Sequence, residues 1–280
     1  MAVVSAITTA GLSLGTAKPA LAEFQIQEAT FEQGIELEYR GAYHWGIPKV
    51  TEDNENANDL RQSHELEMDM AITDWWLVQI TGGLEQPLGE DLNFNSIEIE
   101  TELSLVRRKG DGIGLALQGG YEKALNNGNV VDGNPNEYGF GPIVELAKGP
   151  LLLTLNPLFT RQVGRFADTE GLGFQYGWRA QYALNSRWGV GVEAFGEIED
   201  MANPGSFNSQ NHSIGPTLFL TFGGDDDSKG GDDDEGKAGG DDKKAGKPAI
   251  SEFTMNIGLQ FGLTDATSDA ALKFQGSLEF

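Results

Sequence analysis

The sequence has no cysteine, three histidines and few basic residues. The lack of cysteine excludes disulfides, a thiol nucleophile and metal sites with cysteine ligands. Lys and Arg number 19 against 43 Asp and Glu, which gives a formal net charge of −24. Because such a chain repels phosphate backbones, we expect no nucleic-acid partner, and no motif predicts a cofactor or a metal site. No run reaches the ~18–20 consecutive apolar residues of a membrane-spanning helix, which excludes a helical membrane protein.

The N-terminal stretch has the composition of an export signal. Residues 1–22 are small or apolar with no acidic residue, and Ala20-Leu21-Ala22 forms the small-x-small pattern that export peptidases cut. We therefore expect a signal peptide over residues 1–22 and a mature domain over 23–280. No Lys or Arg precedes the apolar stretch, so we expect translation to start upstream of Met1.

A period of two runs through most of the mature chain. In residues 96–108, for example, the odd positions from Ile97 to Leu105 are apolar or neutral, whereas the even positions from Glu98 to Ser104 are polar. This alternation is typical of strands with two different faces, and a helix would mix the faces. The pattern predicts about twelve strands, at residues 31–45, 61–72, 75–86, 95–108, 112–124, 137–147, 150–162, 172–184, 188–198, 212–222, 250–263 and 270–280.

The connections between these segments alternate in length. Tight turns at residues 73–74, 109–111, 148–149 and 185–187 alternate with polar loops at 46–60, 87–94, 125–136, 163–171 and 199–211. Strands of this length and this alternation are typical of outer-membrane barrels. The predicted fold class is all-β: an antiparallel transmembrane β-barrel of about twelve strands, with short periplasmic turns and long extracellular loops. The predicted location is the bacterial outer membrane, with outer-membrane lipid as a partner.

Aromatic residues fall on the apolar face or near strand ends, where amphipathic rings favour the boundary between water and lipid. The predicted membrane girdle consists of Tyr43, Trp45, Trp76, Tyr121, Trp178 and Trp188. The alternative is a β-sandwich with these rings in its core, but a sandwich does not require a dozen consecutive long strands.

The C-terminal part resembles known outer-membrane proteins. The last strand alternates Leu272, Phe274 and Leu278 with polar residues and ends on Phe280, which resembles the C-terminal assembly signal of bacterial outer-membrane barrels. Residues 182–185 (YALN), 191–197 (GVEAFGE), 212–216 (HSIGP) and 262–269 (GLTDATSD) resemble proteobacterial outer-membrane proteins grouped with the MetA-type transporters, named for phenol-degradation pathways. The resemblance covers about residues 150–280. It implies a barrel-assembly machinery partner that recognises Phe280, and it implies little about a substrate.

Residues 223–249 consist almost entirely of Gly, Asp, Lys and Ala. A segment with nothing to bury is expected to be disordered, and the topology makes it a periplasmic insertion. Its carboxylates could bind Ca²⁺ weakly, but the spacing is not that of an EF-hand and a solvated charge run explains them as well.

The polar parity of the strands predicts an acidic lumen. The acidic residues expected to line it are Glu36, Glu38, Glu65, Glu67, Asp69, Glu98, Glu100, Glu102, Glu193 and Glu197. The basic residues expected there are Arg40, Arg108, Arg179 and Lys273. Walls of carboxylates favour cations, which predicts passive, cation-favouring passage of a small solute. Equally, the carboxylates could pair with bases and water and fill the interior structurally.

Two other functional classes stay open at this point. A hydrolase would need Ser63 with His64, or His44 above Glu36 and Glu38, but neighbouring strand residues point to opposite faces. No Gly-x-Ser-x-Gly elbow is present, so we expect no enzyme and no catalytic residue. The last alternative is a structural or adhesive barrel with a closed lumen that acts through its loops.

Overall fold

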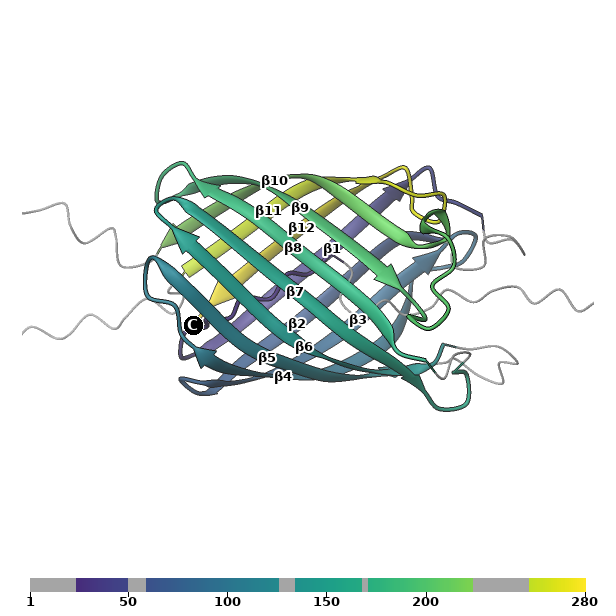
Figure 1. Ribbon diagram of the computed structural model, residues 1–280, viewed down its shortest axis with the longest axis horizontal. Coiled ribbons are helices and arrows are strands. Elements are labelled where there is room, and N and C mark those ends of the chain that lie inside the picture. The colour runs from purple at the N-terminus through teal and green to yellow at the C-terminus, as the bar shows by residue number, and fades with distance from the viewer. Residues whose placement is uncertain (1–23, 50–58, 126–133, 168–170, 224–251) are drawn as a thin grey trace, which may run out of the picture.

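The computed structural model describes residues 24–49, 59–125, 134–167, 171–223 and 252–280. The predicted signal peptide at 1–22 and all but Gly223 of the insertion at 223–249 lie outside these ranges. The described chain forms twelve antiparallel strands (Figure 1). They are β1 (Ile35–Trp45), β2 (Leu60–Thr73), β3 (Trp76–Pro87), β4 (Asn93–Val106), β5 (Gly112–Ala124), β6 (Asn136–Lys148), β7 (Leu151–Val163), β8 (Gly173–Ala183), β9 (Trp188–Ile198), β10 (Asn211–Gly223), β11 (Glu252–Gly262) and β12 (Ala270–Glu279).

The twelve strands close into one barrel. Each strand pairs with its neighbours in sequence, and β1 pairs with β12 from Glu36 opposite Glu279 to Trp45 opposite Ala270. Closure gives every strand a partner on both sides, so no edge is left to hydrogen-bond with water or with other chains. The predicted fold class is confirmed.

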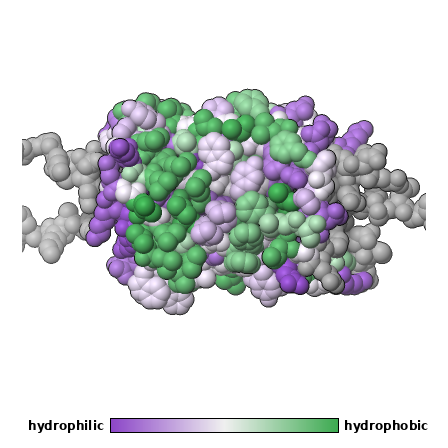
Figure 2. Space-filling view, in the orientation of Figure 1, coloured by the Kyte–Doolittle hydropathy of each residue, from purple (hydrophilic) through white to green (hydrophobic). Residues whose placement is uncertain are grey.

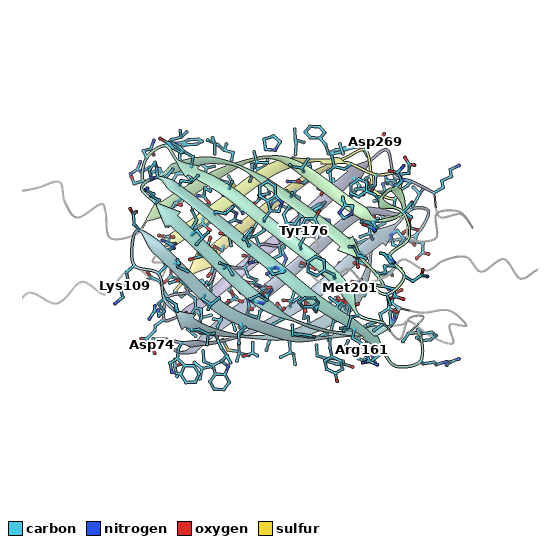
Figure 3. The ribbon with its side chains drawn as sticks, in the orientation of Figure 1. Asp74, Lys109, Arg161, Tyr176, Met201 and Asp269 are labelled. Atoms are coloured by element: carbon cyan, nitrogen blue, oxygen red, sulfur yellow. The ribbon has the colours of Figure 1, made fainter. Side chains whose placement is uncertain are left out.

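The connections separate the two ends of the barrel. At the turn end, Asp74 and Lys109 mark two tight turns, and Gly149 adopts a left-handed φ of 57° in another. At the loop end lie the longer connections, among them the one that carries Asp269 (Figure 3). A single-turn 3₁₀ helix, Phe207–Ser209, is the helical element of the described ranges, and no helix there is long and apolar enough to cross a membrane.

The strand lengths fit a bilayer. At about 3.3 Å per residue and a tilt of about 40°, a strand of 13 residues rises about 33 Å along the barrel axis, more than an apolar band of about 25 Å. Four strands, β5, β6, β7 and β10, have this length of 13 residues.

The largest error in the predicted strand bounds is the start of the first strand, which differs by four residues. The first strand begins at Ile35 rather than at residue 31, because the preceding residues turn into the barrel instead of joining its wall. The fourth strand ends at Val106, so Arg107 and Arg108 lie in the turn. There they bond to residues of that same inner segment, through Phe31 O and Thr30 Oγ1.

Candidate functional site: a divided acidic lumen

The acidic residues of the polar parity face the inside of the barrel. Six of the ten predicted acids are buried, and Glu36, Glu65, Asp69 and Glu197 are partly exposed. The buried six are Glu38, Glu67, Glu98, Glu100, Glu102 and Glu193. Three further buried acids, Glu122, Glu137 and Glu145, belong to the same parity on β5 and β6. We call the inward carboxylates of β1 to β5 the acidic wall.

Arg40 neutralises part of the acidic wall. Its guanidinium is 4% exposed and donates through Nη1 to Glu38 at 2.9 Å and to Glu67 at 2.8 Å. Its Nε donates to Glu65, which lies opposite Arg40 in the β1–β2 register. Glu67 also accepts hydrogen bonds from Thr81 at 2.9 Å and from Gln79 at 3.2 Å. One base is therefore shared by three carboxylates in a buried network.

The other predicted bases pair on the opposite side of the barrel and at the turn end. Glu193 accepts from Arg179 Nε at 2.9 Å and from Lys273 Nζ at 2.5 Å, and all three side chains are buried. Arg108, which lies beyond the end of β4, donates to Glu145 at 2.9 Å. All four predicted lumenal bases are therefore paired, with carboxylates other than those of β4 and β5.

Four glutamates of the acidic wall have no such partner. Glu98, Glu100 and Glu102 on β4 and Glu122 on β5 make no ion pair in the described part of the chain. Each has one buried carboxylate oxygen with no hydrogen-bond partner among the described residues. Because an uncompensated charge is costly in a dry interior, this part of the wall requires water, protons or cations next to it.

The structure adds an element that the sequence analysis missed. Residues 24–31, which we call the lumenal segment, run inside the barrel and line the spaces on both of its sides. Asn156 on β7 holds its middle, accepting from Gln27 N at 2.5 Å and donating to Gln27 O at 3.0 Å. Arg179 donates to Glu28 at 3.1 Å and Lys273 donates to Phe24 O at 3.3 Å.

Apolar contacts fix the end of the lumenal segment that leads to β1. Ala29 is fully buried against Ala116 and Ile143. Its N–H donates to Glu145 at 3.3 Å and its carbonyl accepts from Ser104 Oγ at 2.9 Å. In the sequence, residues 24–31 mix apolar and polar residues and do not keep the strict alternation of the strands. This irregularity is the feature that could have indicated a segment outside the barrel wall.

Gly177 on β8 allows the lumenal segment to approach the wall. A Cβ at this position would lie 3.1 Å from Gln25 O and 3.3 Å from Ile26 Cγ1. Glycine is the residue that admits such a close backbone approach. A Cβ at position 177 would require Gln25 and Ile26 to move by a few tenths of an ångström.

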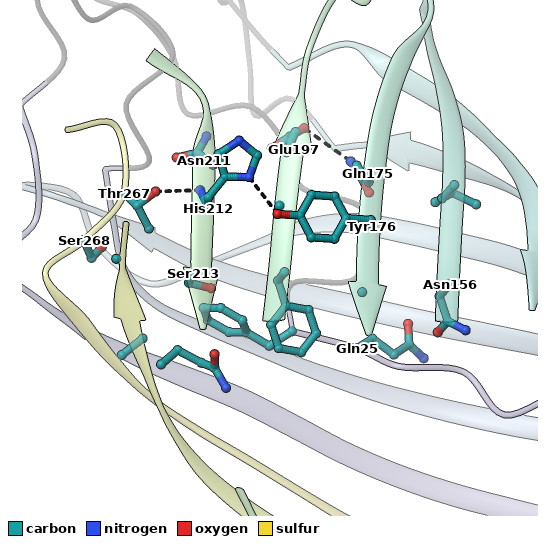
Figure 4. Close-up of a pocket in the computed structure, with 18 of the residues that line it drawn as sticks. Gln25, Asn156, Gln175, Tyr176, Glu197, Asn211, His212, Ser213, Thr267 and Ser268 are labelled. Atoms are coloured by element: carbon teal, nitrogen blue, oxygen red, sulfur yellow. Dashed lines mark hydrogen bonds between the residues drawn. The ribbon is translucent and has the colours of Figure 1, made fainter. Parts of the chain in front are cut away.

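The lumenal segment divides the interior into two vestibules. The loop-end vestibule has an empty volume of about 960 Å³, open solvent included, and its lining includes Gln25, Asn156 and Tyr176 (Figure 4). Phe195 and Gln260 also line it. The turn-end vestibule has a volume of about 1160 Å³ and is lined by acidic residues of the segment and of the strands, including Glu28, Glu36 and Asp69. Gln25 and Gln27 line both vestibules. The two spaces therefore differ in charge.

The outer face of the barrel is apolar between polar ends (Figure 2). Large apolar side chains such as Ile99, Leu117 and Phe140 are 46–55% exposed on it. Soluble proteins rarely expose so many large apolar side chains on one continuous surface. Around a closed barrel, such a surface is expected where the wall contacts the hydrocarbon of a bilayer. The barrel is built for the bacterial outer membrane.

The predicted girdle residues occupy both ends of this outer belt, with one exception. Trp76 and Trp188 begin β3 and β9 at the turn end, and Tyr43, Trp45 and Tyr121 lie near the loop end of β1 and β5. All except Tyr121 are at least 37% exposed. Trp178 is instead the central residue of β8, so it lies within the belt and not at its edge.

The candidate catalytic pairs do not assemble as a hydrolase would need. Ser63 is buried on the inner face, whereas His64 lies among outer-face rings, with Nδ1 2.9 Å from the Tyr39 hydroxyl and its ring 6.3 Å from Phe274. His44 bonds to Ser268 Oγ at 3.1 Å rather than to Glu36 or Glu38.

Comparisons with known proteins give fold-level likenesses. No protein-family model and no curated protein matches the chain. A KdgM porin in complex with disordered oligogalacturonate is similar with a TM-score of 0.48 at 10% identity, covering 88% of this chain and 99% of that one. The NanC porin gives 0.48 at 11%, covering 87% and 98%. Omp33 of Acinetobacter baumannii gives 0.43 at 9%, covering 89% and 98%.

Proposed function

We propose that this chain is an outer-membrane channel that passes small solutes passively and favours cations. The observation that carries the proposal is the charge of the interior. Nine buried glutamates face three buried bases, Arg40, Arg179 and Lys273, among the described residues. A pore wall with excess carboxylates attracts cations and repels anions by direct electrostatics.

The lumenal segment sets the width of the proposed path. Two vestibules of about 960 and 1160 Å³ meet at Gln25 and Gln27, which line both. Solutes would pass beside this segment and past two of the unpaired glutamates of the acidic wall, Glu100 in the loop-end vestibule and Glu102 in the turn-end vestibule. This arrangement favours a low conductance and small solutes over a wide, unselective pore.

Planar-bilayer recording tests the proposal. We expect cation selectivity in a KCl gradient, measured as the reversal potential. The triple variant Glu98→Gln/Glu100→Gln/Glu102→Gln should move the reversal potential toward zero, because it removes three unpaired lumenal charges. The matched control is Asp74→Asn/Asp111→Asn/Asp265→Asn, which removes three exposed charges in turns and loops and should change it little. Anion selectivity, or no conductance at all, would refute the channel.

A closed structural or adhesive barrel is the second candidate, and the anchored lumenal segment is the observation that favours it. The two candidates differ in one measurement. A closed barrel gives no conductance in the native chain and acquires it when residues 24–31 are deleted, whereas a channel conducts in both.

Three further features belong to the same proposal. Phe280, 49% exposed at the end of β12, would be read by the barrel-assembly machinery. Cleavage after Ala22 would make the lumenal segment the mature N-terminus. The resemblance of residues 150–280 to the MetA-type group would place the chain among transporters.

A further inference from the structure

The loop-end vestibule differs in chemistry from the rest of the lumen. Its inward lining contains side-chain amides and aromatic rings, with carboxylates from Glu100 and Glu197. The turn-end vestibule is instead lined by nine acidic residues, from β1, β2, β4, β11, β12, the lumenal segment and the adjoining Glu32. The loop-end vestibule is therefore suited to a polar but uncharged guest.

Gln260 on β11 is the clearest sign of a ligand site. Its side chain is 1% exposed, and neither its amide nitrogen nor its amide oxygen has a hydrogen-bond partner among the described residues. Leaving a buried amide without a hydrogen-bond partner is costly, so buried amides are normally satisfied. An amide that both donates and accepts suits hydroxyl groups, which do the same.

Aromatic rings flank this amide in the vestibule. The Phe24 ring packs edge-on against Phe195 at 5.2 Å and is stacked with His44 at 5.8 Å. Phe195 is on β9 and His44 on β1, so the rings come from strands two positions to either side of β11 in the barrel. Phe24 holds a left-handed φ of 57°, the one non-glycine residue to do so in the described ranges. Such outliers concentrate where a side chain is held for binding.

We propose that the loop-end vestibule binds a neutral sugar. A pyranose presents C–H faces that pack on aromatic rings and hydroxyl groups that pair with an amide, which matches Phe24, Phe195 and Gln260. The empty space of about 960 Å³ in this vestibule includes open solvent, so the chemistry of the lining, and not the volume, supports a small sugar. The inference deepens the proposed channel by naming its solute class, although binding itself requires no conductance.

Calorimetric titration of the detergent-folded barrel tests this site. The probes are glucose, galactose, maltose and sucrose, with gluconate as the anionic comparison. At least one neutral sugar should bind with millimolar affinity, and gluconate should bind more weakly because Glu100 and Glu197 repel it. Gln260→Leu and Phe195→Ala should each weaken binding of that sugar at least ten-fold.

The matched control is Gln181→Leu, the same change on an inward glutamine of the turn-end vestibule, and it should leave the affinity unchanged. Slower migration of boiled than of unboiled protein in SDS verifies that each variant is folded. The site is refuted if no neutral sugar binds, if binding survives both Gln260→Leu and Phe195→Ala, or if gluconate binds as tightly. Failure of the channel alone would appear as sugar binding without conductance.

Discussion

Replacing Arg40 by methionine measures whether the acidic wall around it is dry. The guanidinium is 4% exposed and contacts Glu38 and Glu67 at 2.9 and 2.8 Å, as well as Glu65. Removing one partner of a buried ion pair costs about 3–5 kcal/mol, because the remaining charge is left unpaired. With two buried carboxylates and a third partly exposed one left behind, we expect Arg40→Met to lower the free energy of unfolding by about 3–5 kcal/mol.

The assay is equilibrium unfolding by urea in lipid vesicles, followed by tryptophan fluorescence. The control is Arg107→Met, which removes an exposed pair with Asp74 at 3.7 Å and should cost at most about 1 kcal/mol. Adding Glu67→Met to Arg40→Met should recover part of the loss, since it removes one of the stranded charges. If Arg40→Met lowers the free energy of unfolding no more than the control does, water must reach Glu38, Glu65 and Glu67, and the prediction of a dry network fails.

Three shorter predictions test other parts of the molecule. Leu117→Arg, near the middle of β5 on the belt, should cost about 2–4 kcal/mol in the same assay, whereas Gln118→Arg on the inner face should cost less; the reverse order would contradict a lipid-facing belt. Asn156→Ala should loosen the lumenal segment and raise single-channel conductance, and Asn93→Ala, an exposed loop-end change, should not. Phe280→Ala should reduce the amount of heat-modifiable barrel in outer membranes but leave refolding in detergent unchanged, and equal amounts in cells would remove Phe280 as an assembly signal.

The strands could be predicted because the bilayer imposes a simple rule on each of them. Outward residues contact hydrocarbon and inward residues contact polar groups. Alternating apolar and polar residues in the sequence therefore indicate a strand of the barrel wall. Eleven of the twelve strands begin within two residues of their predicted starts, for example β9 at Trp188 and β12 at Ala270. The exception is β1, because residues 31–34 lead out of the lumenal segment.

The lumenal segment could not be predicted because its position depends on contacts distant in sequence. Asn156 and Gln27 are 129 residues apart, and Ala29 and Glu145 are 116 apart. The backbone of the lumenal segment hydrogen-bonds to side chains of the barrel wall, and such bonds impose no regular spacing of apolar and polar residues on its sequence. The parity of Glu98 to Glu102 predicted an inward face, but only the side-chain contacts show that Arg40 pairs with three other carboxylates, Glu38, Glu65 and Glu67.

The lumenal segment and the acidic wall act on the same path in different ways. The wall sets which charges are favoured, through four glutamates with no paired base. The segment sets how much space remains, and it contributes Phe24 and Gln25 to the loop-end vestibule and Glu28 to the turn-end vestibule. A solute entering from the loop end therefore meets amides and rings before it meets the main concentration of charge. Displacing the segment should alter size limits and sugar binding together, while neutralising the wall should alter ion selectivity and, through Glu100, the discrimination against gluconate.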